Sequence, residues 1–324
     1  MTATLAVGDV TAPARWAGRA ARWPGFRDRE AVGVGQALRE LVDDVLDLER
    51  IERDIFRGRS PRESLLRVFG GQVAGQAMVA AGRTVDDDRG VHSLHGYFLR
   101  PGDPFAPIVY EVDRTRDGRS FTTRRVTAVQ HGETIFTMSA SFQRPEKGVE
   151  HQAPKPDTPD PDGFPRRDMA PVPGDRPAFT TTGRRLTWPL DVRYVDHSPW
   201  DTGEDRDPCN RVWVRADGEL PDPESAAGRL LHVCVLTYAS DLTLLEAAVF
   251  PHVTGGAASG EVSLASLDHA VWFHRPFRAD RWLLYVQESP SAGGGRGLAS
   301  GRFYTEEGVL VASVVQEGLI RRRS

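Results

Sequence analysis

Cysteine and lysine are both scarce in this sequence, which contains two of each among 324 residues. Cys209 and Cys234 are too few for a disulfide framework and have no metal-ligand spacing, so we expect two reduced thiols and no metal. The cations are almost all arginines, whose planar guanidinium suits phosphate groups. The net charge is only −4 and no long basic run occurs, so nucleic acid is not an expected partner.

Long apolar runs are also missing. No segment approaches the roughly 20 apolar residues of a membrane span, and the first residues lack the compact apolar core of a signal peptide. We therefore expect a cytoplasmic protein with no membrane span. The sequence has no Gly-x-Ser-x-Gly or His-Glu-x-x-His motif, which argues against a serine or zinc hydrolase. Residues 293–295 are three glycines without the Lys-Ser/Thr ending of a P-loop, so they indicate a hairpin turn.

The first half of the chain has a regular pattern after a loose start. Residues 1–36 are rich in Ala, Arg, Gly and Pro without a sustained period, so we expect an N-terminal extension. Residues 36–59 carry apolar residues at helical spacing and predict an amphipathic helix. A segment that is apolar nearly all round, 73–81, predicts a buried helix. Runs bounded by turn residues then predict strands at 93–99, 108–114, 121–130 and 134–142.

A proline-rich segment, 145–178, interrupts this pattern and is expected to be a linker, since its composition buries little surface. The pattern then repeats. Residues 231–250 predict a helix in two pieces broken near Ser240, and strands are predicted at 184–194, 210–215, 267–274, 282–288, 297–304 and 309–320. The pair Arg100-Pro101 returns as Arg275-Pro276, an offset of about 175 residues that is the size of a domain.

One buried helix followed by antiparallel strands, present twice, predicts an α+β tandem duplication. A long antiparallel sheet wrapped around a central helix is the hotdog architecture. The predicted fold is therefore a double hotdog, with a first domain at 37–144 and a second domain at 179–324.

Several long motifs resemble the acyl-CoA thioesterase II family. They are FGGQVAGQ at 69–76, VHSLHGYFLRPG at 91–102, YASDL at 238–242, LDHAVWFHRP at 267–276 and GVLVASVVQEG at 308–318. Ordered motifs of this length are more specific than one short pattern. Together they extend over nearly all of the chain from residue 37 to residue 320, apart from the linker.

The resemblance implies a double hotdog that hydrolyses fatty acyl-CoA to free fatty acid and CoA, without a cofactor. It also implies a homodimer or a homotetramer. By position, the catalytic residues of that family fall on Asp241, Ser266 and Gln316, all in the second repeat. The family more often has Thr where this chain has Ser266, but the hydroxyl is kept.

The chemistry of these three residue types is compatible with that role. Asp241 precedes the expected helical segment 242–250, where a carboxylate is favoured, and it could act as a general base toward water. Ser266 and Gln316 each offer donor and acceptor atoms that could orient this water. The oxyanion would be met by backbone N–H groups at a helix start.

Each residue also has a simpler interpretation when judged alone. Asp241 could be a helix cap, Ser266 a loop hydroxyl, and Gln316 a satisfied amide in an apolar strand. Only their joint order favours catalysis. A hotdog enoyl-CoA hydratase, which carries His five residues after the Asp, is disfavoured because Glu246 stands there. A non-catalytic acyl-CoA-binding protein would lose the polar trio, and nothing in the sequence favours a purely structural role.

Four histidines remain as possible general bases. We expect His92 and His95 to be packed or surface side chains, and His269 and His274 to make structural hydrogen bonds.

Overall fold

The computed structural model describes residues 35–61, 67–167, 188–199, 206–254 and 260–323. The predicted extension lies outside them except for its last two residues. The first repeat begins with a short α-helix, α1, that continues as a π-helix, Glu40–Val45. Its elements are α1 (Gln36–Arg39), β1 (Glu49–Glu52), β2 (Ile55–Gly58), α2 (Gly70–Gly82), β3 (Gly90–Phe98), β4 (Ile108–Asp117), β5 (Phe121–Gln130) and β6 (Glu133–Gln143).

The second repeat has the same order of helix and strands, with one additional strand and two short 3-10 helices, η2 and η3. Its elements are η2 (Pro161–Gly163), β7 (Leu190–Tyr194), β8 (Cys209–Ala216), α3 (Ala226–Ser240), η3 (Leu244–Ala248), β9 (Val262–Ser266), β10 (Asp268–Phe273), β11 (Leu283–Gly293), β12 (Arg296–Thr305) and β13 (Leu310–Arg322). Each strand predicted from the sequence has a counterpart among the described residues, although positions 184–187 of the strand predicted at 184–194 lie outside them; β9 was not predicted.

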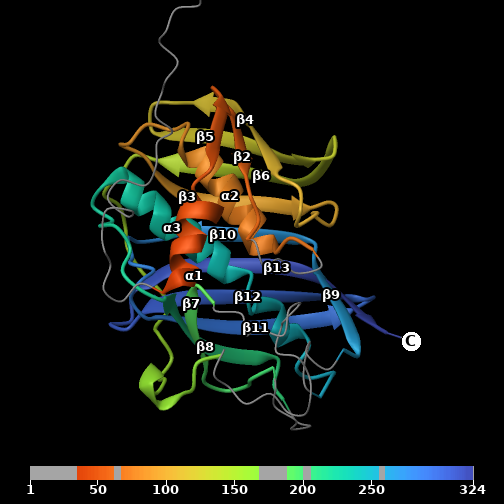
Figure 1. The fold of residues 1–324 in the computed structure, drawn as a ribbon. Helices are drawn as coiled ribbons and strands as arrows, with labels where there is room; N and C mark the ends of the chain where they lie inside the picture. Colours follow the sequence, from red (N-terminus) through yellow and green to blue (C-terminus); the bar gives the residue numbers. More distant parts are fainter. Residues whose placement is uncertain (1–34, 62–66, 168–187, 200–205, 255–259, 324) are drawn as a thin grey trace, which may run out of the picture.

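All described strands join one antiparallel sheet whose order reads β1-β2-β4-β5-β6-β3-β10-β13-β12-β11-β8-β7, with β9 paired to β13. The two halves of this order mirror each other about the β3–β10 pair. At its centre His95 lies opposite Ala270, and these two residues are 175 positions apart, the offset of the sequence repeat. The structure is thus a double hotdog, in which the repeats share one continuous sheet (Figure 1).

The two central helices pack against each other on one face of the sheet (Figure 1). In α2, every residue from Gly71 to Ala81 is buried, as its apolar composition predicts. The contact is close because α2 has no side chain at Gly71, where a Cβ atom would lie 2.4 Å from the Tyr238 carbonyl oxygen. Glycine therefore sets the spacing of the two helices.

The predicted helix over 36–59 is wrong beyond Val45. After Leu48 the chain forms the β1–β2 hairpin, and β2 pairs with β4 along the sheet. Phe56 is buried there while Ile51 is half exposed, so apolar residues at helical spacing serve two different elements. Pairing with the edge of the sheet overrides the local helical pattern.

The described part of the predicted linker, 145–167, packs against the second repeat. The Gln152 amide donates to the Gly308 carbonyl at 2.7 Å, and the Trp213 indole donates to the Pro159 carbonyl at 2.9 Å. This stretch has no regular structure except the 3-10 turn η2. It is therefore held by specific hydrogen bonds rather than behaving as a free spacer.

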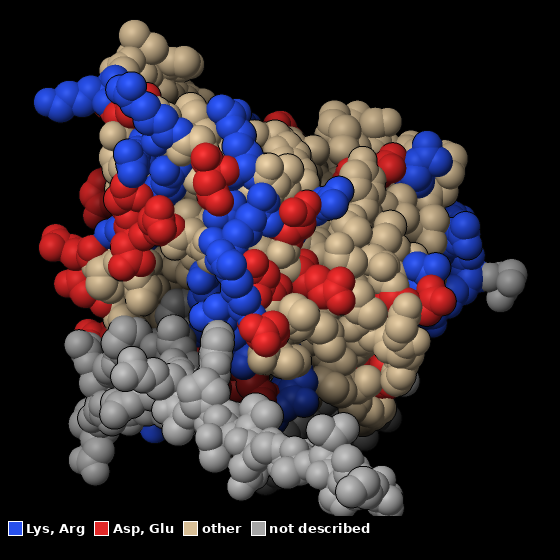
Figure 2. All heavy atoms as spheres, turned by 90° about the horizontal axis from the view of Figure 1, so that it is seen from above, with Lys and Arg blue, Asp and Glu red and all other residues tan. Residues whose placement is uncertain are grey.

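One helical stretch, Ala226–Ala248, is long and apolar enough to span a membrane by composition alone. It comprises α3 and η3, and 78% of its most apolar window is buried inside the protein, as in the core helix of a globular domain. On the surface, the face drawn in Figure 2 shows a band of basic side chains flanked by acidic ones.

Candidate active site

Asp241 lies at the end of α3, not at the start of a helix. It is the C-cap residue of α3, with φ −86° and ψ −7°, and the next helical turn, η3, begins only at Leu244. The N-cap of η3 is Thr243, so Asp241 is neither at the N-terminus of the following helical segment, as expected, nor its N-cap, as in the alternative. The N-cap of α3 is Ser225, whose hydroxyl accepts the Gly228 N–H at 3.0 Å.

The structure brings Asp241, Ser266 and Gln316 together. Ser266 ends β9 and donates its hydroxyl to Asp241 Oδ1 at 3.0 Å. Gln316 lies on the neighbouring strand β13 and donates Nε2 to the same oxygen at 2.5 Å. Oδ1 thus receives two donors from adjacent strands, and their geometry fixes the plane of the carboxylate. Oδ2 receives no protein donor from the described residues.

Asp241 also faces the start of α2, from the first repeat. A Cβ atom on Gly70, the first residue of α2, would lie 2.6 Å from Asp241 Oδ2. The first N–H groups of a helix have no partner inside the helix, and the helix dipole places partial positive charge there. The favourable helix start expected beside Asp241 is therefore present, but it belongs to the other repeat.

Two buried polar atoms close to this cluster lack a hydrogen-bond partner among the described residues: Gln316 Oε1 and His269 Nδ1. Both side chains are fully buried, and they project inward from neighbouring strands. A buried acceptor without a partner is uncommon in a folded protein and indicates a site for an additional donor. Gln316 Oε1 can therefore accept a hydrogen from a bound water or substrate.

The histidines have structural contacts, as expected for His269 and His274. His269 Nε2 lies 2.7 Å from the Ser240 hydroxyl, and His274 Nε2 lies 2.8 Å from the Ser313 hydroxyl. Burial lowers the pKa of His269 from 6.5, while the carboxylates of Asp241 and Asp268 act in the opposite direction. Burial thus favours the neutral imidazole of His269 beside the cluster, a feature that the sequence alone did not reveal.

Outside the trio, the remaining histidines and Glu246 are engaged elsewhere. His92 Nε2 lies 2.8 Å from the Ser141 hydroxyl, and the ring of His95 packs edge-on against Trp272. Glu246, at the position where a hydratase would carry histidine, is buried and pairs with Arg167 and Tyr194. Burial raises the pKa of this carboxyl. Within the described ranges, no cluster of three or more His, Cys, Asp or Glu side chains could hold a metal.

The fold and this inward-facing polar cluster define a hotdog-type protein. A structure from Alicyclobacillus acidocaldarius, described as having a hot dog fold, aligns with a TM-score of 0.68 at 24% identity, covering 90% of this chain and all of that one. An acyl-CoA thioesterase II, TesB2, from Mycobacterium marinum aligns with the same score at 47% identity, covering 87% of this chain and 97% of that chain.

Sequence comparison gives the family. Residues 182–319 match the acyl-CoA thioesterase family, and residues 59–143 match the acyl-CoA thioesterase N-terminal domain. Acyl-coenzyme A thioesterase 8 of Homo sapiens is 41% identical over 292 residues, which cover 87% of this chain and 89% of that protein. Acyl-CoA thioesterase 2 of Haemophilus influenzae is 38% identical over 298 residues, which cover 89% of this chain and 99% of that protein. The chain belongs to the acyl-CoA thioesterase family and is an acyl-CoA thioester hydrolase.

Proposed function

We propose that Asp241, Ser266 and Gln316 activate the water that cleaves the thioester. The observation that carries this proposal is the convergence of two donors on Asp241 Oδ1, which leaves Oδ2 open toward the start of α2. A water beside Oδ2 would donate one hydrogen to it and the other to the unpartnered Gln316 Oε1. Its lone pair is then free to attack the carbonyl carbon.

The reaction balances with these groups alone. As the water oxygen bonds to the carbonyl carbon, Asp241 Oδ2 takes its proton as general base. The negative charge that develops on the carbonyl oxygen is stabilised by the unpaired N–H groups in the first turn of α2. When the tetrahedral intermediate collapses, the carbon–sulfur bond breaks, and the CoA thiolate receives the proton from Asp241. One repeat thus supplies the base and the other supplies the oxyanion donors.

The test is CoA release from acyl-CoAs of increasing chain length, followed with a thiol-reactive dye. Asp241→Asn should fold normally and lose about 10²–10⁴-fold in kcat, because the amide cannot accept the proton. Asp44→Asn, at an exposed carboxyl in the first repeat, is the matched control and should retain wild-type turnover. A wild-type rate for Asp241→Asn would remove Asp241 from the mechanism.

We further propose that the substrates are fatty acyl-CoAs of fatty acid metabolism, and that the enzyme acts in the cytoplasm as a homodimer or homotetramer. The acyl-CoA substrate is supported by the family membership and by the Arg-rich, Lys-poor composition that suits the phosphates of CoA. The chain-length series also tests a non-catalytic binding role. Binding of acyl-CoA without release of CoA by wild type would favour that alternative.

A further inference from the structure

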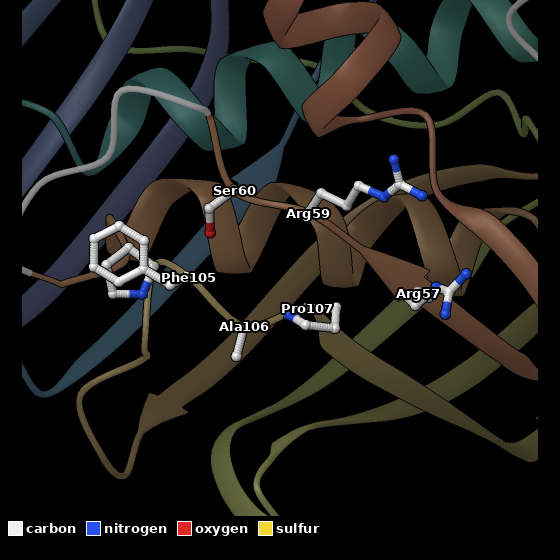
Figure 3. A pocket seen from close by; sticks show the side chains of 7 residues that line it. Arg57, Arg59, Ser60, Phe105, Ala106 and Pro107 are labelled. Carbon is white, nitrogen blue, oxygen red and sulfur yellow. The ribbon is translucent and has the colours of Figure 1, made fainter.

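An open hollow of about 360 Å³ lies beside the first turns of α2, outside the catalytic cluster. Its walls come from two segments, the end of β2 with the residues after it and the loop between β3 and β4. The lining residues are Arg57, Arg59, Ser60, Pro104, Phe105, Ala106 and Pro107. Figure 3 shows Ser60 between the Phe105 ring on one side and the Arg59 and Arg57 side chains on the other.

The first wall is held by buried glutamines of α2. The Gln76 amide donates to the Arg59 carbonyl at 2.8 Å and to the Val45 carbonyl at 2.7 Å. The Gln72 amide donates to the Ser60 hydroxyl at 3.1 Å, which leaves the hydrogen of that hydroxyl available for a ligand. The Arg59 guanidinium is exposed and has no ion pair with the described carboxylates, whereas Arg57 pairs with Glu49.

The second wall is held by a third buried glutamine. Gln130 donates to the carbonyls of Asp103 and Ala106 at 2.9 and 2.8 Å and accepts the Asp103 N–H at 2.9 Å. This fixed loop presents the Phe105 ring at 87% exposure, the highest of the large aromatic side chains described. An exposed aromatic ring on an anchored loop is a platform on which a planar ligand can stack.

The hollow lies at the same end of α2 as the catalytic cluster. Val68, just before α2, donates its N–H to the Gly102 carbonyl at 3.0 Å, so the loop carrying Phe105 is tied to the start of α2. Gln72, which contacts Ser60, lies two residues from Gly70, beside Asp241: about 3 Å along the helix axis and about 200° around it. A long, flexible ligand can therefore cross the end of α2 and occupy both places.

We propose that this hollow binds the phosphorylated adenosine end of CoA, with adenine stacked on Phe105 and the phosphates met by Arg59, Arg57 and the Ser60 hydroxyl. This proposal rests on the proposed function, because it assigns a binding site to the leaving group of that reaction. An aromatic platform suits a purine, and an unpaired guanidinium suits a phosphate. The nearby carboxylates, Glu49 and Asp103, are engaged by Arg57 and by His131.

The test compares two thioesters with the same acyl group, acyl-CoA and acyl-pantetheine, which lacks the nucleotide. Phe105→Ala and Arg59→Ala should each raise KM for acyl-CoA about tenfold while kcat changes little. Kinetics with acyl-pantetheine should be unchanged. Arg281→Ala, at an exposed arginine of the second repeat, is the control with the same loss of charge. Adenosine 3′,5′-bisphosphate should inhibit wild type competitively and inhibit both variants more weakly.

The other outcomes overturn the proposal. Equal effects on both thioesters would place Phe105 and Arg59 near the reacting bond, and a change in chain-length preference would assign the hollow to the acyl tail. If both variants kept the wild-type KM for both thioesters, the nucleotide would bind elsewhere. If wild type cleaves neither thioester, the proposed function fails, and direct titration of adenosine 3′,5′-bisphosphate into wild type and Arg59→Ala still decides whether the hollow binds it.

Discussion

At the scale of single residues, Ser266 tests how the carboxylate is held. Its hydroxyl is one of two donors to Asp241 Oδ1. Ser266→Ala removes one of these hydrogen bonds to a charged group, so kcat should fall about 10–100-fold. Ser266→Thr keeps the hydroxyl on a strand where a β-branched residue fits, and its kcat should stay within about threefold of wild type. Initial rates of CoA release measure both, and full activity of the alanine variant would show that Gln316 alone suffices.

The protonation of His269, beside the same cluster, makes the free energy of unfolding depend on pH. Its pKa is lowered in the folded protein by burial, against the opposing carboxylates of Asp241 and Asp268, so the unfolded chain binds its proton more readily. The associated stability is fully present above pH 6.5 and is lost as the pH falls toward the lower folded value, by up to about 1.4 kcal/mol per unit.

Urea unfolding at about pH 7.5 and about pH 5.5 measures this loss. His269→Gln keeps an amide near Ser240 but does not titrate, so wild type should lose more stability than the variant between the two pH values, by at most about 1.4 kcal/mol. Other buried groups, including His232, contribute equally to both proteins and cancel in the difference. Equal losses in the two proteins would exclude His269 as the source.

At the scale of elements, the contact between α2 and α3 depends on a missing side chain. In Gly71→Ala the new Cβ atom would lie 2.4 Å from the Tyr238 carbonyl, a backbone atom that cannot turn away. The helices must separate, at a cost of about 1–3 kcal/mol that exceeds the gain of about 1 kcal/mol from replacing a helical glycine. The urea midpoint should fall. Gly163→Ala, with open space around it, is the control and should not be destabilised.

The elements also show where prediction from sequence succeeds. The helix at α2 and the strands after it were predicted because each buries a continuous face whose period is visible locally. The β1–β2 hairpin within 36–59 was not predicted, because the pairing of β2 with β4 depends on residues about fifty positions away. Gln316 could be suspected, since an amide interrupts an apolar strand. The contact between the start of α2 and Asp241 could not be predicted, because it joins two repeats. Its only local signal is the pair Gly70-Gly71.

At the scale of the whole molecule, the two repeats depend on each other for folding and for activity. The sheet is continuous across the pairing of β3 with β10, the helices α2 and α3 cover each other, and the proposed base and oxyanion donors come from different repeats. The largest hydrophobic cluster contains buried residues of both repeats, so the repeats should unfold together. We therefore expect one urea transition, with the same midpoint by tryptophan fluorescence and by circular dichroism.

Dividing the chain between Gly148 and Val149 tests this dependence, since Val149 is fully exposed and the linker contacts beginning at Gln152 stay with the second repeat. The fragments 1–148 and 149–324 should each lack thioesterase activity, the first because it has no Asp241 and the second because it has no α2. Mixed together, they should regain turnover as the β3–β10 pairing reforms. If the second fragment alone hydrolysed acyl-CoA at the wild-type rate, the first turn of α2 would have no part in catalysis, and the oxyanion donors would have to lie within the second repeat.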